Sequence, residues 1–152
     1  MRFTIKGSGD FTNVLPDVVK PGTKVLLDGP LGIFTKRAGQ RDKYLLIAGG
    51  IGITPIRSLA EQLSNAGKDT ELFYSASTED QLVLSNELKQ MNLSLRLQTG
   101  RVTLDLIKQA VPDFLEREIF ICGPGPMIVA LRDAFVSAGV PIKHIHYELF
   151  SL

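Results

Sequence analysis

The sequence contains only one cysteine, Cys122, among its 152 residues, and it contains no tryptophan. A single cysteine rules out an internal disulfide and any metal cluster held by several cysteines of this chain. An excess of charge is also missing, because 17 basic residues stand against 16 acidic ones without a basic run. Nucleic acids and anionic membrane surfaces are therefore not expected partners.

Long apolar runs are scarce as well. The longest extends from Tyr44 to Ile53, about half of the ~20 residues that cross a bilayer, and glycines interrupt it. Residues 2–6 alternate like a strand and lack the apolar core of a signal peptide. These absences make the cytoplasm the expected compartment.

An apolar run and an amphipathic helix are joined by closely spaced glycines. The run covers residues 44–48, and apolar positions three and four apart give residues 55–66 the pattern of a helix that Gly67 ends. We expect Thr54 to cap this helix. We expect Pro55 to take its first position, where no N–H is needed.

The turn itself consists of Gly49, Gly50 and Gly52. Because these residues have no side chains, a ligand can approach the backbone in front of free helix N–H groups and the positive end of the helix dipole. The turn therefore predicts a diphosphate site. The alternative is that the glycines serve turn geometry alone, since Pro55 replaces the third glycine of a G-x-G-x-x-G fingerprint.

Strand-like and helix-like patterns alternate from this turn to the end of the chain. The expected strands are residues 44–48, 71–76, 94–98, 118–122 and 143–150. Such alternation predicts an α/β fold with a doubly wound five-stranded parallel sheet. A second glycine-rich turn, Gly123-Pro124-Gly125-Pro126, follows the fourth strand, at the sheet edge where ligands of such folds lie.

The first part of the chain has a different pattern. Residues 3–6 and 24–28 have the character of short strands, and residues 11–19 between them have helical spacing. Two strands do not make an independent sheet. We therefore expect one domain over residues 38–152, with residues 1–37 forming the β remnant of another domain and a linker.

Four motifs occur in an order and spacing that resemble one family. They are Gly29-Pro30-Leu31-Gly32-Ile33-Phe34, Ala48-Gly49-Gly50-Ile51-Gly52-Ile53-Thr54-Pro55, Ile121-Cys122-Gly123-Pro124-Gly125-Pro126-Met127 and Tyr147-Glu148-Leu149-Phe150. From about residue 25 onward the chain resembles the C-terminal NAD(P)-binding domain of the ferredoxin–NADP reductase superfamily. Its ending is most similar to ferric-reductase-like members and oxygenase reductases.

The resemblance implies an NAD(P)H-dependent flavin oxidoreductase. Hydride would pass from NAD(P)H to FAD, and electrons would continue to a haem, ferric iron or iron–sulfur acceptor. Residues 1–37 would then be the last part of a flavin-binding β-barrel. The family's Arg-x-Tyr-Ser/Thr flavin motif is absent, so FAD is expected on a separate flavin-binding domain or subunit. The parent protein is expected to be cytoplasmic or to carry this domain on the cytoplasmic side of a membrane.

The resemblance also assigns site residues. It implies that Thr54, Cys122, Glu148 and Phe150 surround the meeting point of nicotinamide and flavin. Cys122 would shape the hydride path as a thiol rather than act as a nucleophile, because no histidine is placed to activate it. The residues implied to bind the nucleotide are Gly49, Gly50, Gly52, Thr54, Pro55, Ser75, Ser77, Arg101, Cys122, Gly123, Pro124, Gly125 and Met127.

The choice between NADH and NADPH depends on the end of the second strand. Family members that prefer NADPH place a cation there, whereas this chain has Ser75 and Ser77, followed by Glu79 and Asp80. Acidic side chains repel a 2′-phosphate, which favours NADH. Arg101 is either a ligand at the adenosine end or a solvated loop cation.

Two other hypotheses compete with a hydride-transfer domain. A regulatory module would bind a dinucleotide without chemistry, but it would not need the residues at the nicotinamide end. A flavodoxin-like domain would present a hydroxyl-rich first loop, whereas this loop offers only Thr54. The alternating His144, His146 and Glu148 are not expected to hold a metal, because one strand rarely supplies three converging ligands.

Overall fold

The computed structural model describes residues 3–29, 32–35 and 38–149. The chain divides into two compact units, Met1–Gly32 and Ile33–Leu152. The larger unit contains the sheet and every site discussed below. The predicted domain boundary between residues 37 and 38 stays a prediction.

A five-stranded parallel sheet forms the centre of the larger unit. Its strands are β1 (Lys43–Gly49), β2 (Asp69–Ala76), β3 (Ser94–Thr99), β4 (Glu118–Gly123) and β5 (Ile145–Leu149). The strand order is β3-β2-β1-β4-β5, and all neighbouring pairs are parallel. The predicted α/β fold with a five-stranded parallel sheet is confirmed.

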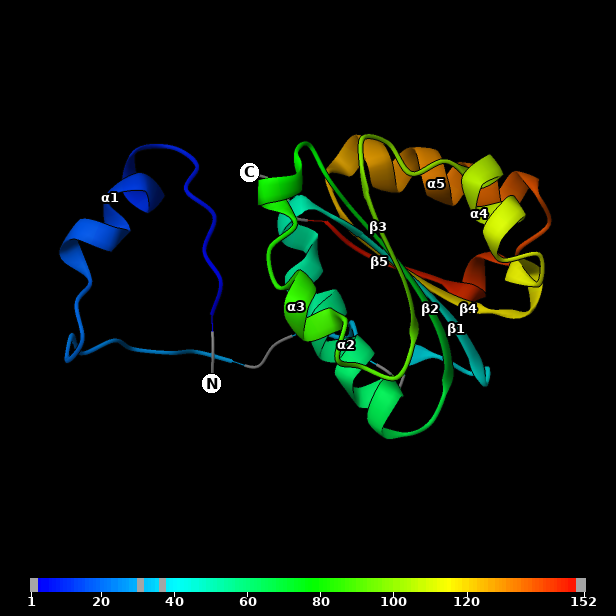
Figure 1. Ribbon diagram of the computed structural model, residues 1–152, viewed down its shortest axis with the longest axis horizontal. Helices are drawn as coiled ribbons and strands as arrows, with labels where there is room; N and C mark the ends of the chain where they lie inside the picture. Colours follow the sequence, from blue (N-terminus) through cyan, green and yellow to red (C-terminus); the bar gives the residue numbers. More distant parts are fainter. Residues whose placement is uncertain (1–2, 30–31, 36–37, 150–152) are drawn as a thin grey trace. The chain divides into compact units, whose positions relative to one another are not determined.

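Helices cover both faces of this sheet (Figure 1). On one face lie α2 (Ile53–Asn65) and the short α3 (Ser85–Leu88), and on the other lie α4 (Leu104–Ala110) and α5 (Gly125–Ser137). Single 3-10 turns occupy Gly50–Gly52, Glu79–Gln81, Phe114–Glu116 and Ile142–His144. The last of these delays β5, which begins at Ile145 and not at residue 143 as predicted.

Each face of the sheet has its own hydrophobic core. Leu45 and Ile47 of β1 pack in the core under α4 and α5, whereas Leu46 and Ala48 pack in the core under α2. Because β1 is buried on both faces, its sequence is a continuous apolar run rather than an alternating one. This explains why the longest apolar stretch of the chain is its central strand.

Helix ends follow the local sequence where capping residues are present. The Thr103 hydroxyl accepts a hydrogen bond from the backbone N–H of Leu106 and so caps α4. After α5, Gly139 takes a positive φ of 99°, and the Val140 N–H returns to the carbonyl of Phe135. These ends need no tertiary contact, so the sequence predicts them well.

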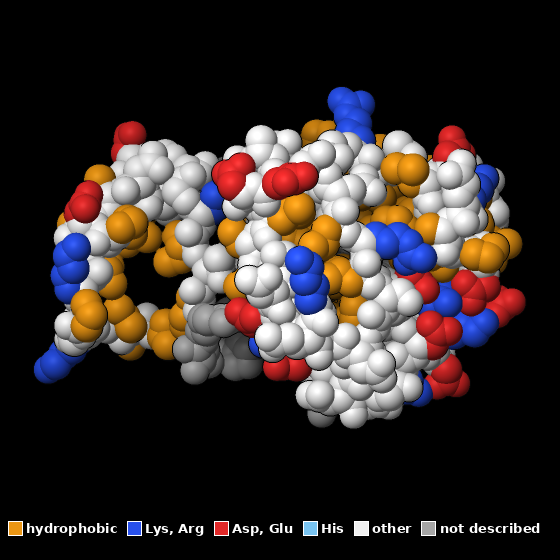
Figure 2. Space-filling model, in the orientation of Figure 1, with side chains coloured by type: hydrophobic (Ala, Val, Ile, Leu, Met, Phe, Trp, Pro, Cys, Tyr) orange, Lys and Arg blue, Asp and Glu red, His pale blue; other side chains and the backbone are white. Residues whose placement is uncertain are grey.

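The smaller unit differs from its prediction. The helix predicted over residues 11–19 is present as α1 (Asp10–Val18). The strands predicted over residues 3–6 and 24–28 are not, since no strand forms within residues 3–29. A strand needs a hydrogen-bonded neighbour, and the two predicted strands find none in the described part of the chain. The side chains of Phe3, Phe11 and Leu26 are exposed. Figure 2 shows hydrophobic and charged side chains on one face of the molecule. The origin of this segment in a flavin-binding barrel stays a prediction.

A charge network lies at the end of the sheet where β1 and β4 begin. The buried Arg117 guanidinium donates to the carboxylates of Asp113 and Asp69, at 2.8 Å and 2.9 Å, and to the carbonyl of Tyr44. Lys43 adds a 2.9 Å ion pair to Asp113. Figure 2 shows acidic and basic side chains intermixed there. The network lies opposite the edge that carries the glycine-rich turns.

Candidate functional site

The two glycine-rich turns meet at the point where the strand order reverses. Strand β1 pairs with β2 on one side and β4 on the other, with Ala48 directly beside Cys122. Helix α2 follows β1 on one face, and α5 follows β4 on the opposite face. Ligands of open α/β sheets lie at this switch point.

Three of the glycines allow the turns to pack against each other. A Cβ on Gly49 would lie 2.7 Å from the Met127 sulfur, and one on Gly123 would lie 2.6 Å from the Met127 methyl group. A Cβ on Gly52 would overlap the backbone carbonyl of Cys122. Protein atoms therefore already occupy the space that these glycines leave.

Two other glycines face open space. Gly50 has a positive φ of 53°, and a Cβ on it would meet nothing within 4 Å. A Cβ on Gly125 would meet only a Leu149 methyl group, at 3.8 Å. The structure thus separates positions that serve packing from positions whose bare backbone is open to a ligand.

The start of α2 corrects the predicted cap. The helix begins at Ile53, two residues before the expected position, because the 3-10 turn Gly50–Gly52 leads directly into it. Thr54 is inside the first turn, and its hydroxyl donates to the carbonyl of Ile51 at 3.1 Å instead of capping the helix. Pro55 is the third helical residue, where an N–H is still not needed.

Cys122 is fully buried at the carboxyl end of β4, on the face covered by α2. Burial, with a smaller contribution from the nearby Glu148 carboxylate, raises the pKa of the Cys122 thiol to about 12. The group is therefore a neutral thiol at physiological pH. The predicted role of Cys122 as a thiol beside the nicotinamide stays a prediction.

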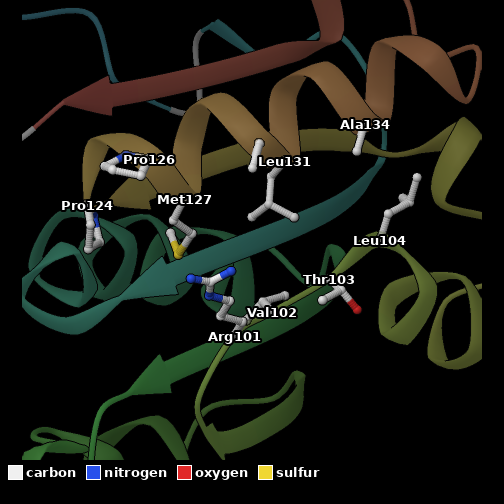
Figure 3. A pocket seen from close by; sticks show the side chains of 10 residues that line it. Arg101, Val102, Thr103, Leu104, Pro124, Pro126, Met127, Leu131 and Ala134 are labelled. Atoms are coloured by element: carbon white, nitrogen blue, oxygen red, sulfur yellow. The ribbon is translucent and has the colours of Figure 1, made fainter.

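A pocket of this edge lies on the other face, between α5 and the connection from β3 to α4 (Figure 3). It has a volume of about 520 Å³ and is mainly apolar. Its walls include Val102, Leu104, Pro124, Pro126, Met127 and Leu131. Arg101 extends into it toward Met127, and no acidic residue is among the residues that line it.

The end of β2 presents one buried and one exposed serine hydroxyl. Ser75 is buried, and its hydroxyl donates to the carbonyl of Gly100. Ser77 is exposed, and Glu79 follows in the 3-10 turn Glu79–Gln81. A ligand role for Ser75 stays a prediction that requires exchange of its present hydrogen bond.

A smaller groove lies beside β5. It has a volume of about 340 Å³ and is lined by Ile33, Phe34, Ala38, His146, Tyr147 and Glu148. Glu148 is partly exposed and is the register partner of Cys122 on β4. Phe150, predicted to cover the flavin, lies outside the described residues.

The predicted site residues within the described part of the chain therefore lie at three locations. The two turns and Cys122 meet at the switch point, Arg101 and Met127 line the larger pocket, and Glu148 lines the smaller groove. Sequence reasoning named Pro124 and Met127 of the larger pocket's apolar wall but missed Val102, Leu104 and Leu131. The run Val102-Thr103-Leu104, which leads into α4, was the available signal, because Thr103 caps the start of the helix next to Arg101.

Residues 46–133 match the family described as the oxidoreductase NAD-binding domain. The chain belongs to this family. The match begins inside β1 and ends in α5, so it includes both glycine-rich turns. The predicted relationship to the reductase superfamily and the NAD-binding role of this domain are thereby confirmed.

Named relatives of this NAD-binding domain are reductase components. The glycine betaine monooxygenase reductase subunit of Pseudomonas aeruginosa is 32% identical, over 93% of this chain and 44% of the relative. The ferredoxin reductase component of the Mycobacterium tuberculosis 3-ketosteroid-9-alpha-monooxygenase is 29% identical, over 99% of this chain and 45% of the relative. The chain thus spans about half the length of these relatives.

Solved structures show the same fold. The ferredoxin reductase in carbazole 1,9a-dioxygenase superposes with a TM-score of 0.76 at 26% identity, over 94% of this chain and 48% of that one. Within the described residues of our chain, no helix has both the length and the apolar character that a membrane crossing requires.

Proposed function

We propose that this domain holds NADH so that its nicotinamide can pass a hydride to FAD on a separate flavin-binding domain. The observation that carries the proposal is the arrangement at the switch point. Gly50 leaves open backbone at the end of β1, an apolar pocket lies beside α5, and a groove that includes Glu148 lies beside β5. A dinucleotide has the matching order of parts: an adenosine, a diphosphate and a nicotinamide.

The adenosine end is assigned to the larger pocket. Its apolar walls suit a purine ring, and its volume of about 520 Å³ falls within the range of small-molecule sites. Arg101 supplies a cation there, and no acidic residue is among the residues that line the pocket. A guanidinium can stack on the base or pair with a phosphate oxygen.

The diphosphate is assigned to the backbone around Gly50 and the start of α2. The first N–H groups of a helix lack partners inside the helix, and the dipole favours negative charge at this end. Gly50 leaves the approach open because nothing lies within 4 Å of its Cβ position. Gly125 opens the start of α5 in the same way.

The nicotinamide end is assigned to Thr54, Cys122 and Glu148. Cys122 and Glu148 are neighbours across β4 and β5, and Thr54 lies in the first turn of α2 on the same face. The protein contributes position and exclusion of water here, while the nicotinamide and flavin supply the hydride chemistry. A neutral thiol at Cys122 adds no charge to the reaction path.

Partners follow from the relatives' names. Monooxygenase reductase components match 93% and 99% of this chain, which supports an electron acceptor that belongs to an oxygenase system. The absence of a flavin motif supports a flavin-binding domain as the direct partner. The exposed side chains Phe3, Phe11 and Leu26 of the smaller unit supply an apolar surface for it.

Calorimetric titration of the 152-residue chain with NADH and NADPH in parallel tests this proposal. We expect NADH to bind and NADPH to bind no more tightly, because Glu79 and Asp80 repel a 2′-phosphate. Tighter binding of NADPH by tenfold, about 1.4 kcal/mol, would contradict the preference for NADH. No binding of either nucleotide would contradict the function itself.

Hydride transfer needs a second measurement. With the flavin-binding domain of the parent protein added, NADH should bleach the flavin absorbance under anaerobic conditions. Binding of NADH without bleaching would instead identify a module that only senses the dinucleotide.

A further inference from the structure

Three hydrogen bonds hold the connection from β3 to α4 at the point where it carries Arg101. The Ser75 hydroxyl donates to the carbonyl of Gly100, and the Gly100 N–H donates to the carbonyl of Ala76 at 3.1 Å. The Gln98 side-chain amide donates to the carbonyl of Arg101 at 3.0 Å. The ends of β2 and β3 therefore both hold this connection.

The two carbonyls that accept hydrogen bonds from side chains flank the Cα atom of Arg101. The Gly100 carbonyl belongs to the peptide group before this Cα atom, and the Arg101 carbonyl belongs to the peptide group after it. Because each peptide group is planar, holding both groups restricts φ and ψ of Arg101 and so sets the direction of its Cα–Cβ bond. This direction determines where the guanidinium can reach.

Strand register brings Ser75 and Gln98 together. Ser75 of β2 is the register partner of Gln98 of β3, so their side chains share one face of the sheet. Side chains alternate along a strand, and Phe73, two residues before Ser75, packs in the core under α4 and α5. Both polar side chains therefore lie on the face that carries the larger pocket.

Burial separates Ser75 from Arg101. Ser75 is 6% exposed, and the one hydrogen of its hydroxyl is used in the bond to Gly100. Arg101 is exposed and extends into the larger pocket toward Met127 (Figure 3). Arg101 is among the residues that line this pocket, whereas Ser75 and Gln98 are not. A ligand in the pocket therefore meets the guanidinium and not the residues that hold it.

We propose that Ser75 and Gln98 are positioning residues, which direct Arg101 into the larger pocket for the adenosine end of the dinucleotide. The inference rests on the proposed function of this pocket. It gives Ser75 a role different from the ligand role that the family resemblance implies, because the hydroxyl acts through Arg101. A side chain that is already held in its binding position loses less conformational freedom when the ligand binds, so the affinity is higher.

Calorimetric titration of a double-mutant cycle with NADH tests whether Ser75 acts through Arg101. In the full chain, Ser75→Ala should weaken NADH binding by about threefold or more. In the Arg101→Ala background the same change should alter the affinity by less than about 1.5-fold, because the group that Ser75 positions is gone. Equal losses in both backgrounds would assign Ser75 to direct ligand contact or to the fold as a whole, and would overturn the proposal. No loss in either background would overturn it too.

Gln98→Met removes the second donor without shortening the side chain. The same pattern is expected, a loss of NADH affinity that disappears in the Arg101→Ala background. Because Gln98 is only half-buried, this variant keeps the inference testable if Ser75→Ala does not fold. A loss that persists without Arg101 would overturn the role of Gln98.

Thr70→Val is the matched control on the same strand. Thr70 is buried near the opposite end of β2, and its hydroxyl donates to the carbonyl of Lys68 at 3.0 Å. The variant removes this bond while keeping the shape of the side chain. NADH affinity should stay within about 1.5-fold of wild type, since Arg101 keeps its position. A loss equal to that in Ser75→Ala would show general loosening and would overturn the proposal.

An NMR relaxation measurement without nucleotide separates this inference from the proposed function. The heteronuclear ¹H–¹⁵N NOE of the Arg101 amide, which reports ps–ns motion of the backbone, should fall in Ser75→Ala and in Gln98→Met. The NOE of the Val111 amide, bonded to Ile107 at the end of α4, should stay unchanged. An unchanged Arg101 NOE would overturn the positioning role. A wild-type chain that does not bind NADH would contradict the proposed function, whereas a fall in the Arg101 NOE would still support the positioning of Arg101.

Discussion

Gly52 lies directly against the backbone carbonyl of Cys122, and a Cβ at this position would overlap that carbonyl. The backbone of Gly52 is in the ordinary right-handed region, with φ of −59°. Its lack of a side chain is therefore required by a contact between two turns, and not by its own conformation. This contact brings the first turn of α2 next to the end of β4.

Gly52→Ala should therefore destabilise the fold through steric overlap. Overpacking in a close-packed region costs about 1–3 kcal/mol, and rigid backbone places this case at the upper end. Gly125→Ala is the control, because its Cβ would meet only a Leu149 methyl group at 3.8 Å. Urea unfolding of both variants measures the difference, and equal stabilities would contradict the packing role.

Gly50→Ala should weaken NADH binding at least tenfold, since a methyl group would enter the open space proposed for the diphosphate. Gly67→Ala, at φ of 63° and equally open, imposes similar backbone strain of about 1 kcal/mol at the end of α2. The melting temperature should fall by a similar amount in the two variants. Calorimetry should then separate them, and similar affinities would exclude a ligand role for Gly50.

Arg101→Ala should weaken NADH binding by five- to tenfold, about 1–1.4 kcal/mol, because a charge-assisted contact in the pocket is lost. Lys108→Ala removes an exposed cation of α4 that does not line the pocket. Titration of both variants with NADH provides the comparison. If the two lose affinity equally, Arg101 is a solvated loop cation.

The Cys122 thiol should resist alkylation and disulfide exchange. With its pKa raised to about 12, its thiolate fraction at pH 8 is about a thousandfold below that of a free cysteine. Reaction with a chromogenic disulfide should therefore be slow in the native chain and fast in guanidinium. Rapid reaction of the native chain would contradict the buried position.

The same group links stability to alkaline pH. The folded chain keeps the thiol proton up to about pH 12, whereas an unfolded chain releases it near pH ~8.5. Its contribution to stability is therefore complete below pH ~8.5 and decreases as the pH rises toward 12. Cys122→Ala should flatten this decrease in urea midpoints between pH 8 and 10.

Asp113→Asn should destabilise the fold at neutral pH and weaken its acid sensitivity. Hydrogen bonds from Arg117, and then from Lys43, lower the pKa of Asp113 against the opposing effect of burial. Because the pKa of Asp113 is lower in the folded chain, its carboxylate stabilises the fold at pH values above its unfolded pKa of ~3.9. This contribution is lost as the pH falls through the pKa of the folded chain. Because the buried Arg117 still pairs with Asp69 in this variant, the free energy of unfolding should fall by only about 1–3 kcal/mol. Urea midpoints from pH 3 to 7 measure it, and parallel curves for both proteins would contradict it.

Much of the candidate site could be read from the chain. The glycine-rich turns, the two strands before them and the helices after them all appear as local patterns, since strand and helix periods differ and glycines and prolines mark the turns. The cap at Thr103 depends only on its own neighbours in the chain. Thr54 was not correctly predicted as a cap, because the 3-10 turn before α2 moved the helix start to Ile53.

The partners of polar groups could not be predicted in this way. His144, His146 and Glu148 lie close in the sequence, but both histidines bind Glu118, which is 26 and 28 residues away from them. The Ser75 hydroxyl is likewise bound to Gly100, 25 residues further on. Such pairs depend on how the strands lie beside one another.

The sequence by itself determined the fold class, the order of strands and helices along the chain and the turns that carry the ligand edge. These depend on hydrophobic periodicity and on residues with restricted or free backbones. Only the tertiary structure decided that Gly52 serves packing while Gly50 stays open, and that Glu118 holds residues from three segments. The physical reason is that packing and hydrogen-bond partners depend on distances between residues far apart in the chain, which are fixed when the sheet and its helices assemble.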